Sequence, residues 1–382
     1  SLLISTLKAY FLGKKDLFEG LAVEQLEQKW TVHPVLHLDL NTAKYKEPGK
    51  LDAVLDKTLS KWEKLYDIKP HDPDFGMRFE DVIQCAYEKS GERVVVLVDE
   101  YDKPLLETIG NEALQDDYRS TLKSFYGALK SKDGCIKFAM LTGVTKFGKV
   151  SVFSDLNNLI DISLNDSFYN ICGIDEDEMH ANFAPYVSRI GKVQKLTDEE
   201  VYAELKRNYD GYHFSESTPG MYNPFSVLSA FFNNKFGSYW FETGTPSYLV
   251  ELLKRHDFKL DELKGNKVTA NVLSAIDASS SDPIPVIFQS GYLTISGYNE
   301  RYKLYSLDFP NEEVREGFML YLMPYYTSVS ANKTGFQISC FVEEVKSGDI
   351  SGFMTRLESF FANVPYDLIK DTENHYQNVL FI

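Results

Sequence analysis

The most informative stretch of this chain is Val94-Val-Val-Leu-Val-Asp-Glu-Tyr-Asp-Lys-Pro104. Its first five residues are apolar and mostly β-branched, which is typical of a strand that is covered on both faces. The carboxylates of Asp99 and Glu100 follow directly at the carboxyl end of that strand. Burying two adjacent carboxylates without partners costs free energy, so we expect them to face a cation or a reacting water. The alternative is that both are solvated and cap the next element.

Further strands and helices surround this stretch in the first half of the chain. The segments 34–40 and 136–142 are short and apolar, as expected of buried strands. Apolar residues recur with helical spacing in 2–12, 49–65, 78–90 and 112–131. Strands separated by helices predict an α/β fold with a parallel sheet. Ligands of such sheets bind at the carboxyl ends of the strands.

The second half of the chain has a different pattern, dominated by short helices. Helical spacing is found in 175–183, 198–207 and 224–233. Two candidate strands follow at 291–295 and 301–305, with Ser-Gly-Tyr-Asn-Glu as the turn between them. Helices followed by a β-hairpin are typical of a winged-helix module. From residue 311 onward we expect helices again.

Composition bounds the class of protein. With 382 residues the chain is long enough for about two or three domains. The formal charge of −16 argues against broad, salt-driven binding of nucleic acid. No apolar stretch approaches the roughly 20 residues of a membrane span, and the first residues lack the features of a signal peptide. We expect isolated, buried thiols, which suit a reducing cytoplasm, at the four cysteines Cys85, Cys135, Cys172 and Cys340.

Polar side chains at two strand ends match the chemistry of a P-loop ATPase. In such enzymes an aspartate here orients Mg²⁺ and the next glutamate orients the attacking water or accepts its proton, which predicts these roles for Asp99 and Glu100. Thr142 ends the neighbouring strand, where a polar sensor contacts the γ-phosphate or the water. The alternative is that Thr142 is simply a β-branched strand residue. Asp102 is interpreted as a supporting hydrogen-bond acceptor or as a helix cap.

Strings along nearly the whole chain, in the expected order, resemble the bacterial AAA-ATPase-like family. The resemblance is carried by SLLISTLKAYFLGKKDLFEGLAV, PVLHLDL, VVVLVDEYDKPLLE, LTGVTKFGKVSVFSDLNNLIDISL, YDGYHFS, YNPFSVL, YWFETGTPSYLVELL and GYLTI. It implies a P-loop NTPase core at 1–170, a helical lid at 171–240 and a winged-helix-like module at 241–310. It also implies that ATP and Mg²⁺ are ligands.

The resemblance implies further elements at both ends. In the family, a strand and a loop of the Arg-Arg-Phe-Gly-Lys-Ser type precede the string that begins at Ser1. Ser1 would be the last residue of that loop, and its hydroxyl would bind Mg²⁺. The Gly and Lys are not in the sequence, so it is either a truncated form or one whose mobile loop is unrecorded, and we expect no useful hydrolysis of ATP without them.

A nuclease-like domain of the PD-(D/E)XK class often follows in the family. The helical segment 311–382 would be the start of such a domain, truncated before its catalytic strands. Glu344-Val-Lys346 matches its Glu-x-Lys motif by letters alone, and we interpret it as a solvated helix face.

Two further places are candidates for nucleotide contacts. In related ATPases a lid motif at the position of Tyr209-Asp-Gly-Tyr-His-Phe214 touches the nucleotide, which implies contacts from Tyr212 and His213. The alternative is a turn that packs its aromatic rings on the core. Arg119 is a candidate arginine finger toward a neighbouring subunit, although an exposed helix arginine is the commoner case.

Two functions therefore stay open. The first is an ATP-driven switch that controls a C-terminal effector domain. The second is a non-hydrolysing nucleotide-binding or scaffold protein whose main activity is the nuclease-like domain. The expected partners are ATP and a protein or a second copy of the chain, with nucleic acid only through the C-terminal domain and no membrane. Segment 246–310 carries slightly more acidic than basic residues, which favours protein contacts over DNA contacts for the winged-helix-like module.

Overall fold

The computed structural model describes residues 1–69, 72–145, 152–153, 156–242, 249, 252–253, 258–274, 282–327, 329–362 and 372–382. The chain divides into two compact units. The first is Ser1–Ile160, and the second comprises Asp161–Leu273 and Ser280–Ile382.

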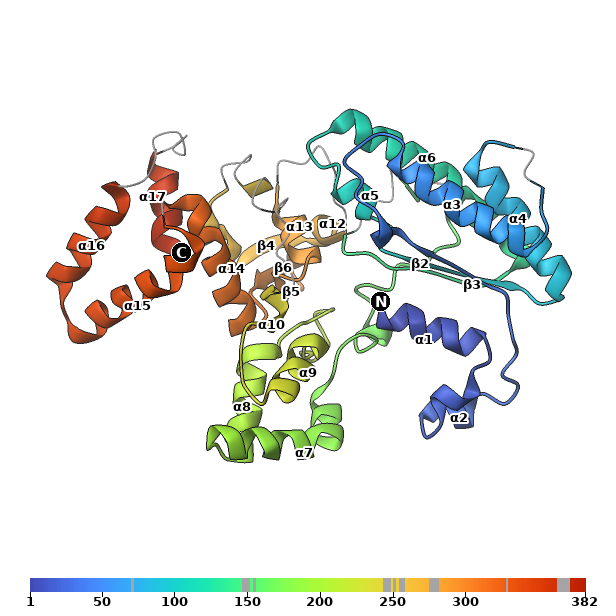
Figure 1. Cartoon of the computed structure of the whole chain (residues 1–382). Helices are drawn as coiled ribbons and strands as arrows, with labels where there is room; N and C mark the ends of the chain where they lie inside the picture. Colours follow the sequence, from blue (N-terminus) through green and yellow to red (C-terminus); the bar gives the residue numbers. More distant parts are fainter. Residues whose placement is uncertain are drawn as a thin grey trace. The chain divides into compact units, whose positions relative to one another are not determined.

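The first unit is an α/β structure built on a parallel three-stranded sheet (Figure 1). The strands are β1 (Val35–Asp39), β2 (Val94–Asp99) and β3 (Ile136–Leu141), with β2 in the centre. The helices are α1 (Leu2–Phe11), η1 (Lys15–Phe18), α2 (Ala22–Leu26), η2 (Leu40–Thr42), α3 (Lys50–Leu65), α4 (Phe75–Ser90), α5 (Lys103–Leu106), α6 (Glu112–Ser131) and η3 (Asp133–Cys135). The predicted α/β class and parallel sheet are confirmed.

Helices cover both faces of this sheet, with α1 on one face and α3, α4 and α6 on the other (Figure 1). Alternate side chains of a strand point to opposite faces, so Val95, Leu97 and Asp99 share a face. Ile4 and Phe11 of α1 pack against Val95 and Leu97. Every residue of β2 is buried, which explains its continuous apolar sequence.

Across the other face, a buried ion pair joins two helices. The Arg78 guanidinium of α4 donates to both carboxylate oxygens of Glu63 in α3, at 2.7 and 2.8 Å. It also donates to Asp56 at 2.7 Å. The side chains of Arg78 and Glu63 are only 8% and 4% exposed. Glu63 is therefore the buried partner of the Arg78 charge, and Asp56 is a second, more exposed partner.

The second unit is mainly helical and contains an antiparallel sheet of order β4-β6-β5. Its strands are β4 (Asn266–Thr269), β5 (Thr294–Asn299) and β6 (Leu304–Asp308). The helices are η4 (Asp166–Phe168), α7 (Glu176–Gln194), α8 (Asp198–Tyr209), α9 (Pro224–Asn233), α10 (Tyr239–Glu242), η5 (Leu260–Leu263), α12 (Ala270–Ser274), α13 (Ile284–Gln289), α14 (Glu312–Tyr326), α15 (Ala331–Ser347), α16 (Ile350–Ala362) and α17 (Thr372–Phe381).

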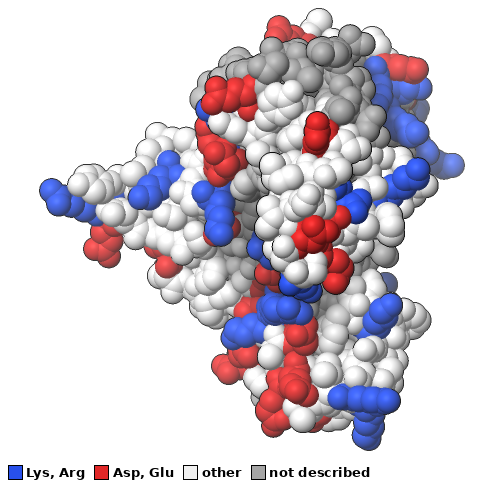
Figure 2. All heavy atoms as spheres, turned by 90° about the vertical axis from the view of Figure 1, so that its left-hand side faces the viewer, with Lys and Arg blue, Asp and Glu red and all other residues white. Residues whose placement is uncertain are grey.

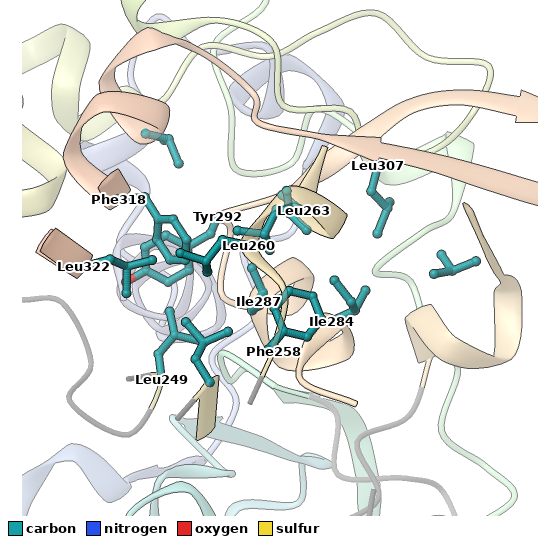
Figure 3. Packing of buried hydrophobic residues seen from close by; sticks show 14 of the residues in the cluster. Leu249, Phe258, Leu260, Leu263, Ile284, Ile287, Tyr292, Leu307, Phe318 and Leu322 are labelled. Carbon is teal, nitrogen blue, oxygen red and sulfur yellow. The ribbon is translucent and has the colours of Figure 1, made fainter. Parts of the chain in front are cut away.

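One core of this unit joins its helices to the β5–β6 hairpin (Figure 3). Its members include Leu260, Ile287, Tyr292, Leu307 and Phe318. A second core lies among α7, α8 and α9. Both α7 and α8 begin with a capping box, in which the N-cap side chain and the glutamate three residues later satisfy each other's backbone amides.

Several details differ from the predictions. The hairpin forms, but its strands begin three residues later than expected, so the predicted turn residues 296–299 lie in β5. Helix α7 continues past Pro185 to Gln194, because Val187 and Ile190 are buried in the core. All four cysteines are free, as predicted, but none is buried and Cys172 is exposed.

The Glu-x-Lys letters lie in helix α15, as predicted, but the face is not simply solvated. Arg356 of α16 donates two hydrogen bonds to Glu344, at 2.6 and 2.8 Å, and the Glu344 side chain is 15% exposed. Lys346 is exposed. Glu344 therefore joins α15 to α16 through its ion pair with Arg356.

The described parts of the surface carry charges of both signs. On the face shown in Figure 2, basic and acidic side chains are interspersed, and no extended basic area is visible among the described residues. Among the described residues, no helix is long and apolar enough to cross a membrane.

Candidate functional site

The centre of the candidate site is Asp99, the last residue of the central strand β2. Asp99 lies on the face of the sheet covered by α1, and it is 7% exposed. Because α1 packs along this face, its first residue reaches the end of the strand. The Ser1 amino group contacts Asp99 Oδ2 directly. The Ser1 hydroxyl caps α1 by accepting from the Ile4 amide at 3.4 Å.

Thr142 approaches Asp99 from the neighbouring strand. The Thr142 amide donates to the Val98 carbonyl at 2.9 Å, which continues the β2–β3 pairing past the end of β3. This bond aligns the Thr142 hydroxyl, which donates to Asp99 Oδ1 at 2.6 Å. Burial raises the pKa of Asp99, and the hydrogen bond from Thr142 opposes that effect. This hydrogen bond therefore stabilises the ionised carboxylate of Asp99.

Glu100 has a different environment from its neighbour. Its φ of 57° is left-handed, a conformation that side-chain-bearing residues rarely adopt. Among the residues that the structure describes, none hydrogen-bonds or ion-pairs with the Glu100 carboxylate. Burial, followed by the charges of Asp102 and Asp99, raises its pKa. A carboxylate with a raised pKa and no partner is suited to accept a proton.

Asp102 is fully buried two residues further on. Asp102 is the N-cap residue of α5, as predicted, but its side chain makes no capping hydrogen bond there. Instead it accepts hydrogen bonds from the segment after Thr142, from Val144 and Thr145. Burial raises the pKa of Asp102, and these hydrogen bonds oppose that effect.

The first unit therefore brings Ser1, Asp99 and Thr142 together, with Glu100 adjacent in sequence. Sequence reasoning did not single out Gly143 or Thr145, both of which contact Asp102. The signal that favoured them was weak, because small residues after an apolar strand are common in any α/β protein.

Tyr212 and His213 belong to the second unit, and both have partners there. The Tyr212 backbone pairs with Met221, and its ring packs against the core that contains Tyr292. The His213 amide donates to Thr294 at 2.7 Å, and its Nδ1 lies 2.9 Å from the Thr218 carbonyl. Contact of Tyr212 and His213 with nucleotide stays a prediction.

Arg119 also has local partners. It contacts Asp116 and donates to Gln115 at 3.2 Å, all within α6. A role as an arginine finger likewise stays a prediction.

The donor set around Asp99 suits a small, hard cation. Mg²⁺ prefers oxygen ligands and binds proteins through one or two carboxylates, keeping waters and substrate phosphates as its other ligands. Asp99 supplies a carboxylate and Ser1 a hydroxyl oxygen at the start of a helix. No group of three or more His, Cys, Asp or Glu residues that would hold a metal by itself is found among the described residues. The residues present therefore fit a magnesium ion that is shared with a ligand.

Comparisons with known proteins place the chain in a family. The profile of a family described as "Predicted AAA-ATPase" matches residues 1–153. An "Uncharacterized protein in vnfD 5'region" from Azotobacter chroococcum mcd 1 is 33% identical over 395 residues, which cover 100% of this chain and 73% of that protein. No solved structure matches. The profile covers the unit that carries Asp99, and the relative extends the similarity over the whole chain, so the protein belongs to the AAA-ATPase-like family.

Proposed function

We propose that this protein is an ATP-hydrolysing switch whose catalytic edge contains Ser1, Asp99, Glu100 and Thr142. The observation that carries the proposal is the contact between the start of α1 and the end of β2, with the Thr142 hydroxyl 2.6 Å from Asp99 on the same edge. Membership of the family supports nucleotide as the ligand.

The start of α1 favours binding of an anion. The first amides of a helix have no partner within the helix, and the helix dipole places partial positive charge there. The first turn of α1 contains no acidic residue. The polyphosphate of ATP would lie at this helix start, beside Asp99.

Magnesium, when bound with ATP, would neutralise phosphate charge and be held by Asp99 and the Ser1 hydroxyl. Glu100 orients a water toward the γ-phosphorus and accepts its proton as the new phosphorus–oxygen bond forms. The bond between the γ-phosphorus and the bridging oxygen breaks, and ADP leaves with that oxygen. The Thr142 hydroxyl orients Asp99 and would lie beside the γ-phosphate.

The remaining parts would transmit the nucleotide state. We propose that the helices in 171–240 act as a lid and that the hairpin-containing segment 241–310 acts as a winged-helix-like module. The lid prediction includes contacts from Tyr212 and His213 to the nucleotide. Segment 311–382 would lead into a C-terminal effector domain of the nuclease-like class.

The test is phosphate release by the full-length protein. Glu100→Gln keeps the size of the side chain but removes the proton acceptor. We expect turnover to fall at least about a hundredfold, the scale of a lost general base, while Mg-ATP binding is retained. Glu88→Gln makes the same chemical change on an exposed part of α4 and should leave turnover unchanged.

The outcomes separate the two functions. Wild-type turnover in Glu100→Gln would remove Glu100 from the reaction. Tight nucleotide binding without phosphate release by the wild-type protein would favour the alternative, a non-hydrolysing nucleotide-binding or scaffold protein.

A further inference from the structure

Asp102 is the most deeply buried carboxylate near the candidate site, with no exposed surface. Its Oδ2 accepts from the Thr145 amide at 2.5 Å and from the Thr145 hydroxyl at 2.6 Å. Its Oδ1 accepts from the Val144 amide at 3.3 Å. Each of these donors is neutral, so among the described residues the carboxylate of Asp102 is compensated by hydrogen bonds. All three donors belong to the segment that begins with Thr142.

A second set of bonds ties the same segment to the turn after β2. The Tyr101 amide donates to the Thr142 carbonyl at 2.9 Å. The Tyr101 hydroxyl donates to the Thr145 carbonyl at 2.8 Å. Residues 142–145, the clamped segment, are thus held at both ends by the turn that contains Glu100. The left-handed backbone of Glu100 directs the chain so that Tyr101 and Asp102 can make these bonds.

Gly143 shows how closely the two parts approach. A Cβ added to Gly143 would collide with Asp102 Oδ1 and lie 2.9 Å from Tyr101 Cδ1. A side chain at this position would push the clamped segment away from Asp102. The Thr142 hydroxyl, at the start of that segment, would move with it and lose its alignment with Asp99.

We propose that Asp102 is a positioning residue that fixes the Thr142 hydroxyl relative to Asp99 and Glu100. This inference rests on the proposed ATPase function, because its consequence is the geometry of that reaction. Asp102 touches neither nucleotide nor water; it acts through the clamped segment. A misplacement of about 1 Å can lower the rate of an enzyme roughly a hundredfold, so loss of the clamp should affect turnover more than binding.

The main experiment compares Asp102→Asn, Thr142→Ala and the double variant in full-length protein. An Asn retains one oxygen acceptor for Thr145, but its amide meets the Val144 amide donor to donor. We expect Asp102→Asn to lower kcat about tenfold or more, equivalent to about 1.4 kcal/mol, with the Kd for Mg-ATP changed less than about twofold. If Asp102 acts through Thr142, its substitution should cost much less kcat in the Thr142→Ala background.

Gly143→Ala gives a second readout, because it leaves the carboxylate of Asp102 in place but displaces the clamped segment. It should reproduce the loss of kcat, again with the Kd for Mg-ATP changed less than about twofold.

Thermal unfolding accompanies each variant. If Asp102→Asn does not fold, Thr145→Val, which removes only the hydroxyl donor, takes its place in the same double-variant comparison. Unchanged kcat in Asp102→Asn would overturn the inference. An equal loss of kcat from Asp102→Asn in the wild-type and Thr142→Ala backgrounds would also overturn it. Glu100→Gln is measured in parallel: if it abolishes turnover while Asp102→Asn does not, only the positioning role fails. If Glu100→Gln also retains turnover, the proposed function itself fails.

Discussion

Replacing Glu100 by glycine should give a protein that is more stable than the alanine variant and less active than the wild type. Glu100 has a φ of 57°, and a left-handed conformation costs an L-residue about 1–2 kcal/mol. Glycine avoids that cost but loses about 0.5–1 kcal/mol through the greater freedom of its unfolded chain. We therefore expect Glu100→Gly to exceed Glu100→Ala in free energy of unfolding by about 0.5–1 kcal/mol. Both variants lack the carboxylate, so this difference isolates the backbone.

The assay is chemical or thermal unfolding of the two variants, with phosphate release by the full-length forms. For a unit of this size the expected difference in Tm is roughly 2 °C. Both variants should lose turnover at least about a hundredfold. Lys303 is a matched control, because it is exposed and has a φ of 53° in the β5–β6 turn. Lys303→Gly should gain similar stability over Lys303→Ala without loss of turnover.

Equal stability of Glu100→Gly and Glu100→Ala would refute the argument from backbone strain. Wild-type turnover in Glu100→Gly would refute the catalytic role. If Glu100→Gly is more stable than Glu100→Ala but less active than the wild type, the backbone strain at Glu100 is retained for function.

Three further predictions concern stability and pH. Glu63→Ala should lower the free energy of unfolding of the first unit by about 3 kcal/mol in urea titrations, because it leaves the buried Arg78 charge with only the exposed Asp56 as an ion-pair partner. A change below about 1 kcal/mol would contradict this. The Asn378 side chain accepts a hydrogen bond from the Leu260 amide at 2.8 Å and donates one to the Phe258 carbonyl at 2.9 Å. Asn378→Ala should therefore lower the free energy of unfolding of the second unit by about 2 kcal/mol in the same titrations. Wild-type stability of this variant would contradict the prediction. As pH falls, kcat should begin to drop at a pH above the ordinary glutamate pKa of about 4.3, because the ionised carboxylate of Glu100 is the active form and its pKa is raised. An acid limb of kcat at or below that value would count against Glu100 as the base.

Local sequence predicted the elements of the first unit well. The helix at 112–131 has its predicted bounds in α6, and the strands differ by no more than one residue at either end. Here hydrophobic periodicity and burial agree, since each helix packs one apolar face on a sheet that is itself apolar. The approach of Ser1 to Asp99 also follows, because α1 lies on the face to which Asp99 points.

Tertiary packing decided the features that were mispredicted. Pro185 removes a backbone donor, which argues for a helix end, but burial of Val187 and Ile190 outweighs that loss in α7. The hairpin was shifted because Gly297 and the polar residues around it resemble a turn, whereas pairing with β6 extends the strand through them. Neither effect is visible in a window of a few neighbouring residues.

The three carboxylates Asp99, Glu100 and Asp102 show where local sequence has no information. They are chemically similar and lie within four positions, yet each has a different environment. Asp99 accepts a hydrogen bond from the Thr142 hydroxyl, and Asp102 accepts hydrogen bonds from donors 42 and 43 residues away in sequence. Glu100 has no described partner, so its raised pKa reflects burial and the two neighbouring charges. Because Asp102 both clamps the Thr142 segment and raises the pKa of Glu100, one buried charge links the geometry of the site to its proton affinity. Substitutions at Asp102 should therefore change rate and pH profile together, whereas those at Thr142 should change the rate alone.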